Sequence, residues 1–115
     1  MTKPVSVGEL FVRSIHAHDY RRVCSLVTQD VRTDWEAFAR RNPKLFSSAD
    51  CPSFAADFYR EPRGNLQGTL AKIDRATVRV EGQTARLIMH PDDRERGRDG
   101  NATLRHVGNR WLLDD

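Results

Sequence analysis

The chain has 115 residues, of which 38% are hydrophobic and 30% charged, and its formal net charge is +3; this length allows one domain with a single two-layer core. No apolar run reaches the roughly 18 residues that a membrane span requires, and the opening "MTKPVSVGEL" has no apolar stretch, so we expect neither a transmembrane segment nor a signal peptide in this chain. Most arginines have acidic neighbours, as in "DDRERGRD", which is typical of a solvated surface of mixed charge, so we expect no nucleic-acid binding.

Two helices are predicted at the start of the chain. The first begins at a capping box, Ser6-x-x-Glu9, whose side chains satisfy free backbone N–H groups. Its predicted buried face carries residues that recur at helical spacing, namely Val7, Leu10, Phe11 and Ile15. Asp19 then suits the N-cap of a second, shorter helix, whose buried side would carry Tyr20, Val23, Cys24 and Val27.

The stretch "IHAHDYRRVC" between these helices contains several side chains that bind metals. His16 and His18 are two residues apart, so on a helix they project about 200° from each other and cannot share a metal ion. We interpret the stretch as a helix–turn–helix corner, and we expect no metal site and no cofactor site in the chain.

Two further helices follow. A second capping box, Thr33-x-x-Glu36, predicts the start of a third helix, with Trp35, Phe38 and Ala39 on one side. That helix ends at Asn42, because the residue before a proline avoids the helical region. A fourth helix is predicted from about Asp50 to Arg60, with Pro52 in its first turn and Phe54, Ala55 and Phe58 facing inward.

The second half of the chain is predicted to form strands. "TLAKIDRATVRV" alternates through Ala76, Val78 and Val80, with Asp74 in a bulge or twist before them. A tight turn at Glu81-Gly82 leads into "QTARLIMH", and Gly108-Asn109 turns "NATLRHV" into "RWLLDD". Such short connections leave no room for crossover helices. The predicted fold class is therefore α+β, with the N-terminal helices packed on one face of a curved, mostly antiparallel sheet.

The two cysteines leave two alternatives open. Cys24 and Cys51 are either two buried thiols or one disulfide that closes a loop of about 27 residues, which would contribute roughly 3–4 kcal/mol to stability. A bonded pair would place the domain outside the cytoplasm, whereas free thiols would fit a cytoplasmic protein.

Three segments together resemble a known superfamily. "HDYRRVCSLVTQDVR" resembles the "aGDyaaacallsp" start of the nuclear transport factor 2-like, or cystatin-like cone, superfamily. "ATVRVEGQTARLIM" and "TLRHVGNRWLLDD" are similar to its "v-x-v-x-G-d-x-A-x-v" hairpin and its closing "l-x-r-x-x-g-x-W-x-v-d" strand pair. The resemblance spans roughly Val7 to Asp114, is closest to small actinobacterial secreted or tethered domains, and implies a single cone-shaped domain over residues 1–115.

The resemblance also carries expectations about particular residues. In the related domains a cysteine on the second helix often accompanies one on the third or fourth, as Cys24 and Cys51 would here. Trp111 occupies the place of the closing-strand tryptophan, which packs against the helices. Two departures are the insert "RERGRDG", which lengthens one hairpin, and a start without a signal peptide or a lipobox.

The superfamily contains isomerases, cyclases and dehydratases as well as proteins that only bind, so the fold does not settle the function. An enzyme similar to ketosteroid isomerase needs a base inside an apolar cone and an acid such as a tyrosine opposite it. Both tyrosines of this chain fall on predicted helices, and the strand-borne candidates for the base are Asp74, His90 and His106. His106 shares a strand face with Leu104, and His90 shares one with Ile88.

Without a convincing acid–base pair, we expect a non-catalytic binding or protein-interaction domain. The alternative is an enzyme of ketosteroid-isomerase or polyketide-cyclase type that acts on a small apolar substrate with His106 or Asp74 as its base. The expected partner is a small apolar ligand or another protein. A homodimer through the open sheet face, where Ile88 and Leu112 could lie, is a further possibility.

Overall fold

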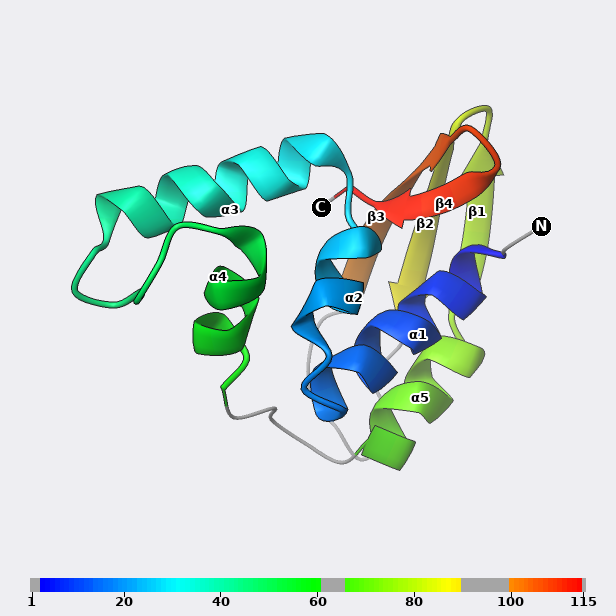
Figure 1. The fold of residues 1–115 in the computed structure, drawn as a ribbon. Coiled ribbons are helices and arrows are strands. Elements are labelled where there is room, and N and C mark those ends of the chain that lie inside the picture. Colours follow the sequence, from blue (N-terminus) through cyan, green and yellow to red (C-terminus); the bar gives the residue numbers. More distant parts are fainter. Residues whose placement is uncertain (1–2, 61–65, 90–99, 115) are drawn as a thin grey trace.

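Helices come first and strands last in the fold. The computed structural model describes residues 3–60, 66–89 and 100–114, and it confirms the α+β class (Figure 1). The helices are α1 (Pro4–His16), α2 (Tyr20–Ser25), α3 (Gln29–Arg41), α4 (Cys51–Phe58) and α5 (Leu66–Asp74). The strands are β1 (Thr77–Glu81), β2 (Thr84–Met89), β3 (Gly100–Val107) and β4 (Arg110–Leu113).

The four strands form an antiparallel meander in the order β1-β2-β3-β4, as predicted. Two-residue turns join β1 to β2 and β3 to β4, and each has a glycine with a φ of +61° at its first position, Gly82 and Gly108. Glycine suits such turns because it adopts positive φ without steric cost. The first turn consists of Gly82 and Gln83, one residue later than predicted, since Glu81 still pairs with Thr84.

One core lies between the sheet and α1. Side chains alternate between the two faces of a strand, so the apolar side chains of β2 and β3 point toward the helices. The register of the two strands places these side chains on the same face of the sheet. Val7 and Leu26 cover this face from the helical side. The buried members of this cluster are at most 4% exposed, and they are Val7, Leu26, Ala85, Leu87 and Leu104.

A second core joins α1, α2 and α4. It consists of the buried residues Ile15, Val23, Cys24, Cys51 and Ala55. Partly buried aromatic side chains surround it, among them Trp35 of α3. Helix α4 therefore attaches to the rest of the molecule largely through this cluster. Helices α3 and α4 extend away from the sheet in Figure 1.

The corner between α1 and α2 is confirmed as a turn. His18 has a φ of +57°, and a carboxylate oxygen of Asp19 accepts a hydrogen bond from the backbone N–H of Arg22 at 3.4 Å. This is the N-cap interaction that the sequence predicts. Over the described residues no group of three His, Cys, Asp or Glu side chains could hold a metal ion.

Both predicted capping boxes are wrong. Helix α1 begins at Pro4, one turn before its expected start, because the fixed φ of proline suits the first helical position. Helix α3 begins at Gln29 rather than Thr33, since the hydroxyl of Thr28 accepts a hydrogen bond from the N–H of Val31. The predicted end of α3 at Asn42 is confirmed. Helix α4, predicted from about Asp50 to Arg60, runs from Cys51 to Phe58 with Asp50 as its N-cap.

The inward faces of α3 and α4 differ in part from the prediction. Phe58 is 59% exposed, although the sequence predicts that it faces inward. Phe38, predicted on the same side of α3 as Ala39, is 43% exposed, whereas Ala39 is buried. The residue after Phe58, Tyr59, turns toward the core instead and packs at the edge of the second cluster.

The strand predicted through Asp74 is wrong, because Leu66–Asp74 forms helix α5. Leu70 and Ile73 are buried on one face of this helix. A side chain at Gly8 of α1 would lie 3.3 Å from Leu87 and 3.5 Å from Ile73. The absence of a side chain at Gly8 thus lets α5 and the sheet approach α1 closely, and this packing stabilises the helical conformation.

The last strand is hydrogen-bonded to the segment before α3. The N–H of Leu113 donates to the carbonyl of Leu26 at 2.7 Å, and the N–H of Thr28 donates to the carbonyl of Leu113 at 2.8 Å. The Thr28 hydroxyl also donates to Asp114 at 2.7 Å. We call these contacts the β4 clasp.

None of the described helices is long and apolar enough to cross a membrane.

Candidate binding cleft

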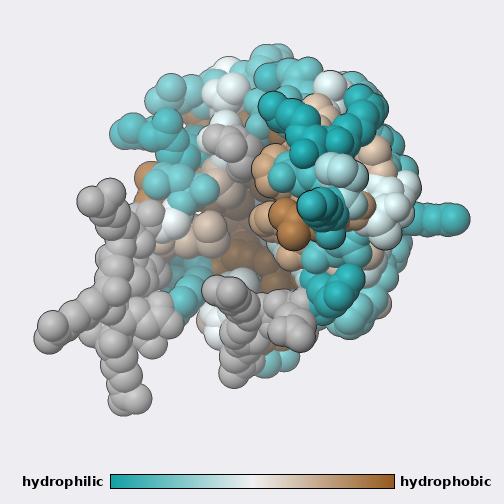
Figure 2. All heavy atoms as spheres, turned by 90° about the vertical axis from the view of Figure 1, so that its left-hand side faces the viewer, coloured by the Kyte–Doolittle hydropathy of each residue, from teal (hydrophilic) through white to brown (hydrophobic). Residues whose placement is uncertain are grey.

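An apolar cleft lies beneath α3 and has a volume of about 240 Å³. Figure 2 shows the face that bears α3 and α4, with an apolar hollow at its centre and hydrophilic side chains around it. The apolar lining of the cleft comes from helices, a loop and the last strand, and the carboxylates lie beside it. The lining residues are Phe11, Val27, Val31, Asp34, Trp35, Tyr59, Leu113 and Asp114.

The aromatic walls of the cleft are held by ring packing. Val31 and Trp35 are four residues apart on α3, so they lie on the same face of that helix. The Trp35 ring stacks on Phe54 of α4 with ring centroids 5.2 Å apart. Phe11 of α1 meets Tyr59 edge-on at 6.0 Å. These contacts give the cleft walls a defined position before any ligand binds.

The three polar groups of the cleft differ in their electrostatic state. Burial raises the pKa of the Tyr59 phenol, so the group stays neutral at physiological pH. Asp114 is compensated, since one carboxylate oxygen accepts the Thr28 hydroxyl and the other lies 2.9 Å from the Arg105 guanidinium. Asp34 is exposed, and it forms no ion pair with any residue that the structure describes.

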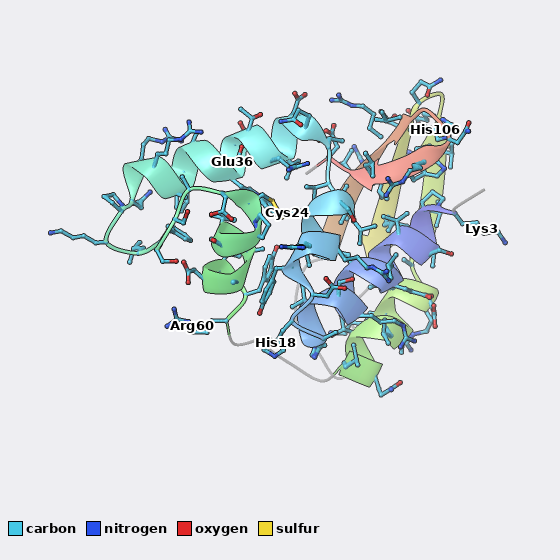
Figure 3. All side chains as sticks on the ribbon, viewed as in Figure 1. Lys3, His18, Cys24, Glu36, Arg60 and His106 are labelled. Atoms are coloured by element: carbon cyan, nitrogen blue, oxygen red, sulfur yellow. A yellow bond between two sulfur atoms is a disulfide. The ribbon has the colours of Figure 1, made fainter. Side chains whose placement is uncertain are left out.

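His106 lies away from this cleft. It is on the inner face of β3 together with Leu104, as its strand parity predicts, and its ring packs against Trp111 with centroids 4.9 Å apart. Its backbone N–H donates to the carbonyl of Gln83 at 2.7 Å. Figure 3 shows His106 toward the hairpin turns, far from Arg60 at the other side of the molecule. The side chain packs beside the core and does not line the cleft.

Asp74 is also outside the cleft. It is the exposed last residue of α5, and its carboxyl group meets Glu9 of α1. The hydrogen bond from Asp74 raises the pKa of Glu9. The third candidate, His90, lies outside the described residues.

Cys24 and Cys51 lie at disulfide-bonding distance, with their sulfur atoms 2.12 Å and their Cα atoms 6.2 Å apart. The pair links α2 to α4 within the second core, where both residues are buried (Figure 3). Because α4 carries Phe54 and leads into Tyr59, the link also holds one wall of the cleft against the body of the domain.

The outer face of the sheet is mostly polar. The register places Ile88 and Leu112 on this face, as the sequence suggests, because Leu87 and Leu113 point to the other side. Their neighbours on the outer face include arginines at four positions, Arg79, Arg86, Arg105 and Arg110. A homodimer through this face stays a prediction.

The sequence points to part of this cleft only. Tyr59 is four residues from the buried Ala55, a spacing that could have placed it on the inner side of α4. No local pattern marks Asp34 or Asp114 as neighbours of the same cavity, because they are 80 residues apart in the chain (114 − 34).

Comparisons of the chain with models of protein families, with curated proteins and with solved structures find no match.

Proposed function

We propose that the chain is a non-catalytic binding domain of nuclear transport factor 2-like type that takes a small apolar ligand, or an apolar segment of a protein partner, in the cleft beneath α3. The observation that carries the proposal is the apolar lining, with Trp35 and Phe11 fixed by other rings. Helices on one face of an antiparallel meander support the family assignment, and the cone shape belongs to the same proposal.

The size of the cleft restricts the ligand. Sites for drug-sized molecules have volumes of roughly 300–1,000 Å³, and this cleft has about 240 Å³. A single ring system or one or two apolar side chains of a partner would fill it. Tyr59 would orient such a group, since its phenol can donate a hydrogen bond from within the apolar wall.

The positions of the predicted bases support a role without catalysis. His106 packs on Trp111, and Asp74 is on the surface beside Glu9, so neither lies where a ligand in this cleft would bind. Asp114 is neutralised by Arg105.

One observation favours the enzymatic alternative. Asp34 and Tyr59 line the same cleft, and a carboxylate base opposite a neutral phenol is the pairing that an isomerase acting on a small apolar substrate needs. If the chain is such an enzyme, Asp34→Asn and Tyr59→Phe abolish turnover while ligand binding persists. Binding that depends on the cleft without any turnover of cyclic ketone substrates would support the binding domain.

The decisive experiment is a screen of small apolar fragments by two-dimensional NMR. We expect binders to shift the signals of Val31, Trp35 and Leu113. Val31→Phe should fill the cleft and weaken their binding by at least tenfold, or about 1.4 kcal/mol. The matched control is Val80→Phe, the same change at a residue of β1 that is 54% exposed. Fragments that bind elsewhere, or binding that Val31→Phe leaves intact, would refute the proposal.

Two further proposals accompany the first. We place the domain outside the cytoplasm, because Cys24 and Cys51 lie at bonding distance. A mass measured without reductant on protein from its natural source would show whether the two cysteines are oxidised.

A homodimer through the outer sheet face would be detected by light scattering, and Leu112→Arg would dissociate it.

A further inference from the structure

The far end of the α3–α4 region exposes large apolar side chains. Leu45 is 69% exposed, Phe58 59% and Phe38 43%. Leu45 lies in the turn after α3, and the other two side chains lie on α3 and α4. We call these three residues together with Phe46 the apolar tip. Exposure of this size costs free energy in water, so the tip is a candidate for contact with an apolar phase.

The apolar tip is a built structure. Phe46 stacks on Phe54 with centroids 4.9 Å apart, and Phe54 stacks on Phe58 at 5.5 Å. Phe38 meets Phe46 edge-on at 5.6 Å. The exposed rings are thereby joined through the buried Phe54.

Hydrogen bonds fix the turn that carries Leu45. The Asn42 side chain donates to the carbonyl of Phe38 at 2.8 Å, and the N–H and hydroxyl of Ser47 both donate to Asp57 at 3.0 Å. The turn is thus held at both ends, and Leu45 projects from a fixed support.

The exposed charges on the α3 side of the tip are positive. Arg40, Arg41 and Lys44 are exposed, and the sequence has no acidic residue between Glu36 and Asp50. Beyond Phe58, the side chain of Arg60 is 76% exposed and forms an ion pair with Asp57 at 3.3 Å. Figure 3 shows Arg60 at the edge of the molecule on this side. Exposed apolar groups bordered by cations suit a surface that is apolar inside and negatively charged outside.

The shape of the tip favours a lipid surface over a protein. In Figure 1 α3 extends away from the sheet and the turn after it lies at its far end, so this turn is on a protruding part of the molecule. A peptide helix requires a groove for its apolar face. A second copy that docked tip to tip would bring Lys44 and Arg41 of both chains together, which their like charges oppose. We propose that the apolar tip inserts into the surface of a bilayer of anionic lipids, with the basic residues against the headgroups.

Vesicle sedimentation tests the proposal. Vesicles made from equal parts of phosphatidylcholine and phosphatidylglycerol should bind the protein, vesicles of phosphatidylcholine alone should bind it more weakly, and salt should weaken the first interaction. Leu45→Ser should lower the partition coefficient about tenfold, and Lys44→Glu should lower it by a similar factor for the anionic vesicles only. Val80→Ser makes a comparable change at the exposed edge of the sheet and should have no effect.

Three results would overturn the proposal. The first is no sedimentation with anionic vesicles, and the second is an equal loss in Leu45→Ser and Val80→Ser. The third is a dimer in light scattering that Leu45→Ser dissociates, because the tip would then bind a second copy. Circular dichroism of each variant checks the fold, and Phe58→Ser repeats the test at a second position if Leu45→Ser unfolds the protein. The fragment screen for the cleft does not depend on these outcomes.

Discussion

Removal of the Cys24–Cys51 link should lower the stability of the domain by several kilocalories per mole. The change is the double substitution Cys24→Ala and Cys51→Ala. Alanine is the right replacement because the two cysteines are only 4% and 1% exposed, and serine would add buried hydroxyl groups that need hydrogen-bond partners.

The magnitude follows from the loop that the link closes. The two residues are 27 apart in sequence, and the chain-entropy relation gives about 12 cal/mol/K for a loop of this size, or about 3.5 kcal/mol at about 25 °C. Loss of the two sulfur atoms from the second core adds roughly 1 kcal/mol of lost burial. We therefore expect the free energy of unfolding to fall by about 3.5–4.5 kcal/mol, a large share of the roughly 5–15 kcal/mol that stabilises a typical domain.

Urea unfolding measured by circular dichroism gives this difference directly. The parent protein should be compared with the double variant and with the parent in reductant. The free energies of unfolding of the double variant and of the reduced parent should agree within about 1 kcal/mol. Hydrogen exchange adds a local readout. Amides of α4 should lose protection first, because α4 attaches to the body of the domain through the second core.

Two results would refute this reasoning. A difference in unfolding free energy below about 1 kcal/mol would mean that packing alone holds α4 in place. A mass of the air-oxidised parent that corresponds to two free thiols would mean that the cysteines pack as buried thiols.

Three smaller perturbations test other parts of the structure. Leu104→Ala removes a side chain that is 0% exposed at the centre of the first core, and urea unfolding should show a loss of about 3–4 kcal/mol. Asp74→Asn places an amide donor beside Glu9, so the pKa of Glu9 should fall from its raised value toward its ordinary 4.5 in an NMR titration. When a carboxyl group has a higher pKa in the folded than in the unfolded protein, its contribution to stability is full below the unfolded-state pKa. That contribution is lost as the pH rises through the folded-state pKa. The variant should therefore be more stable than the parent at neutral pH, and this difference should vanish in acid. Ser47→Ala removes one of the donors to Asp57, whose pKa is lowered first by the Ser47 backbone N–H and then by its hydroxyl. The pKa of Asp57 should therefore rise part of the way toward 3.8, and the stability difference from the parent, present above that pH, should disappear as the pH falls through the lowered pKa.

The sheet could be predicted from the sequence because its signals are local. Alternating side chains define each strand, and the glycines at Gly82 and Gly108 occupy turn positions that other residues adopt only with strain. Each of these features involves neighbours along the chain, so the order and direction of the described strands followed from the sequence.

Helix starts and helix α5 were harder to predict because distant contacts decide them. The start of α3 depends on Thr28, whose hydroxyl also bonds Asp114, a residue 86 positions away. The segment before β1 carries helical spacing and alternation together, and its packing beside Gly8 selects the helix. A single sequence contains both patterns and gives no measure of the packing that chooses between them.

The cleft depends both on local sequence patterns and on contacts between residues that are distant in the chain. The aromatic spacing on α3 is visible in the sequence, but the wall opposite belongs to β4, and the position of Tyr59 depends on where α4 ends. The histidine and aspartate candidates were chosen for their strand position, whereas the described cavity takes its polar groups from α3, from the end of α4 and from the residue after β4.

The β4 clasp also has a consequence for the order in which the protein can fold during synthesis. The carbonyl of Leu26 and the N–H of Thr28 receive their partners only when Leu113 has left the ribosome, which at roughly 5–20 residues per second is several seconds later. Until then α1 lacks β4, one of the strands that pack against it. The helical half should therefore wait as a loosely packed intermediate, and the appearance of β4 should complete the fold in a single late step.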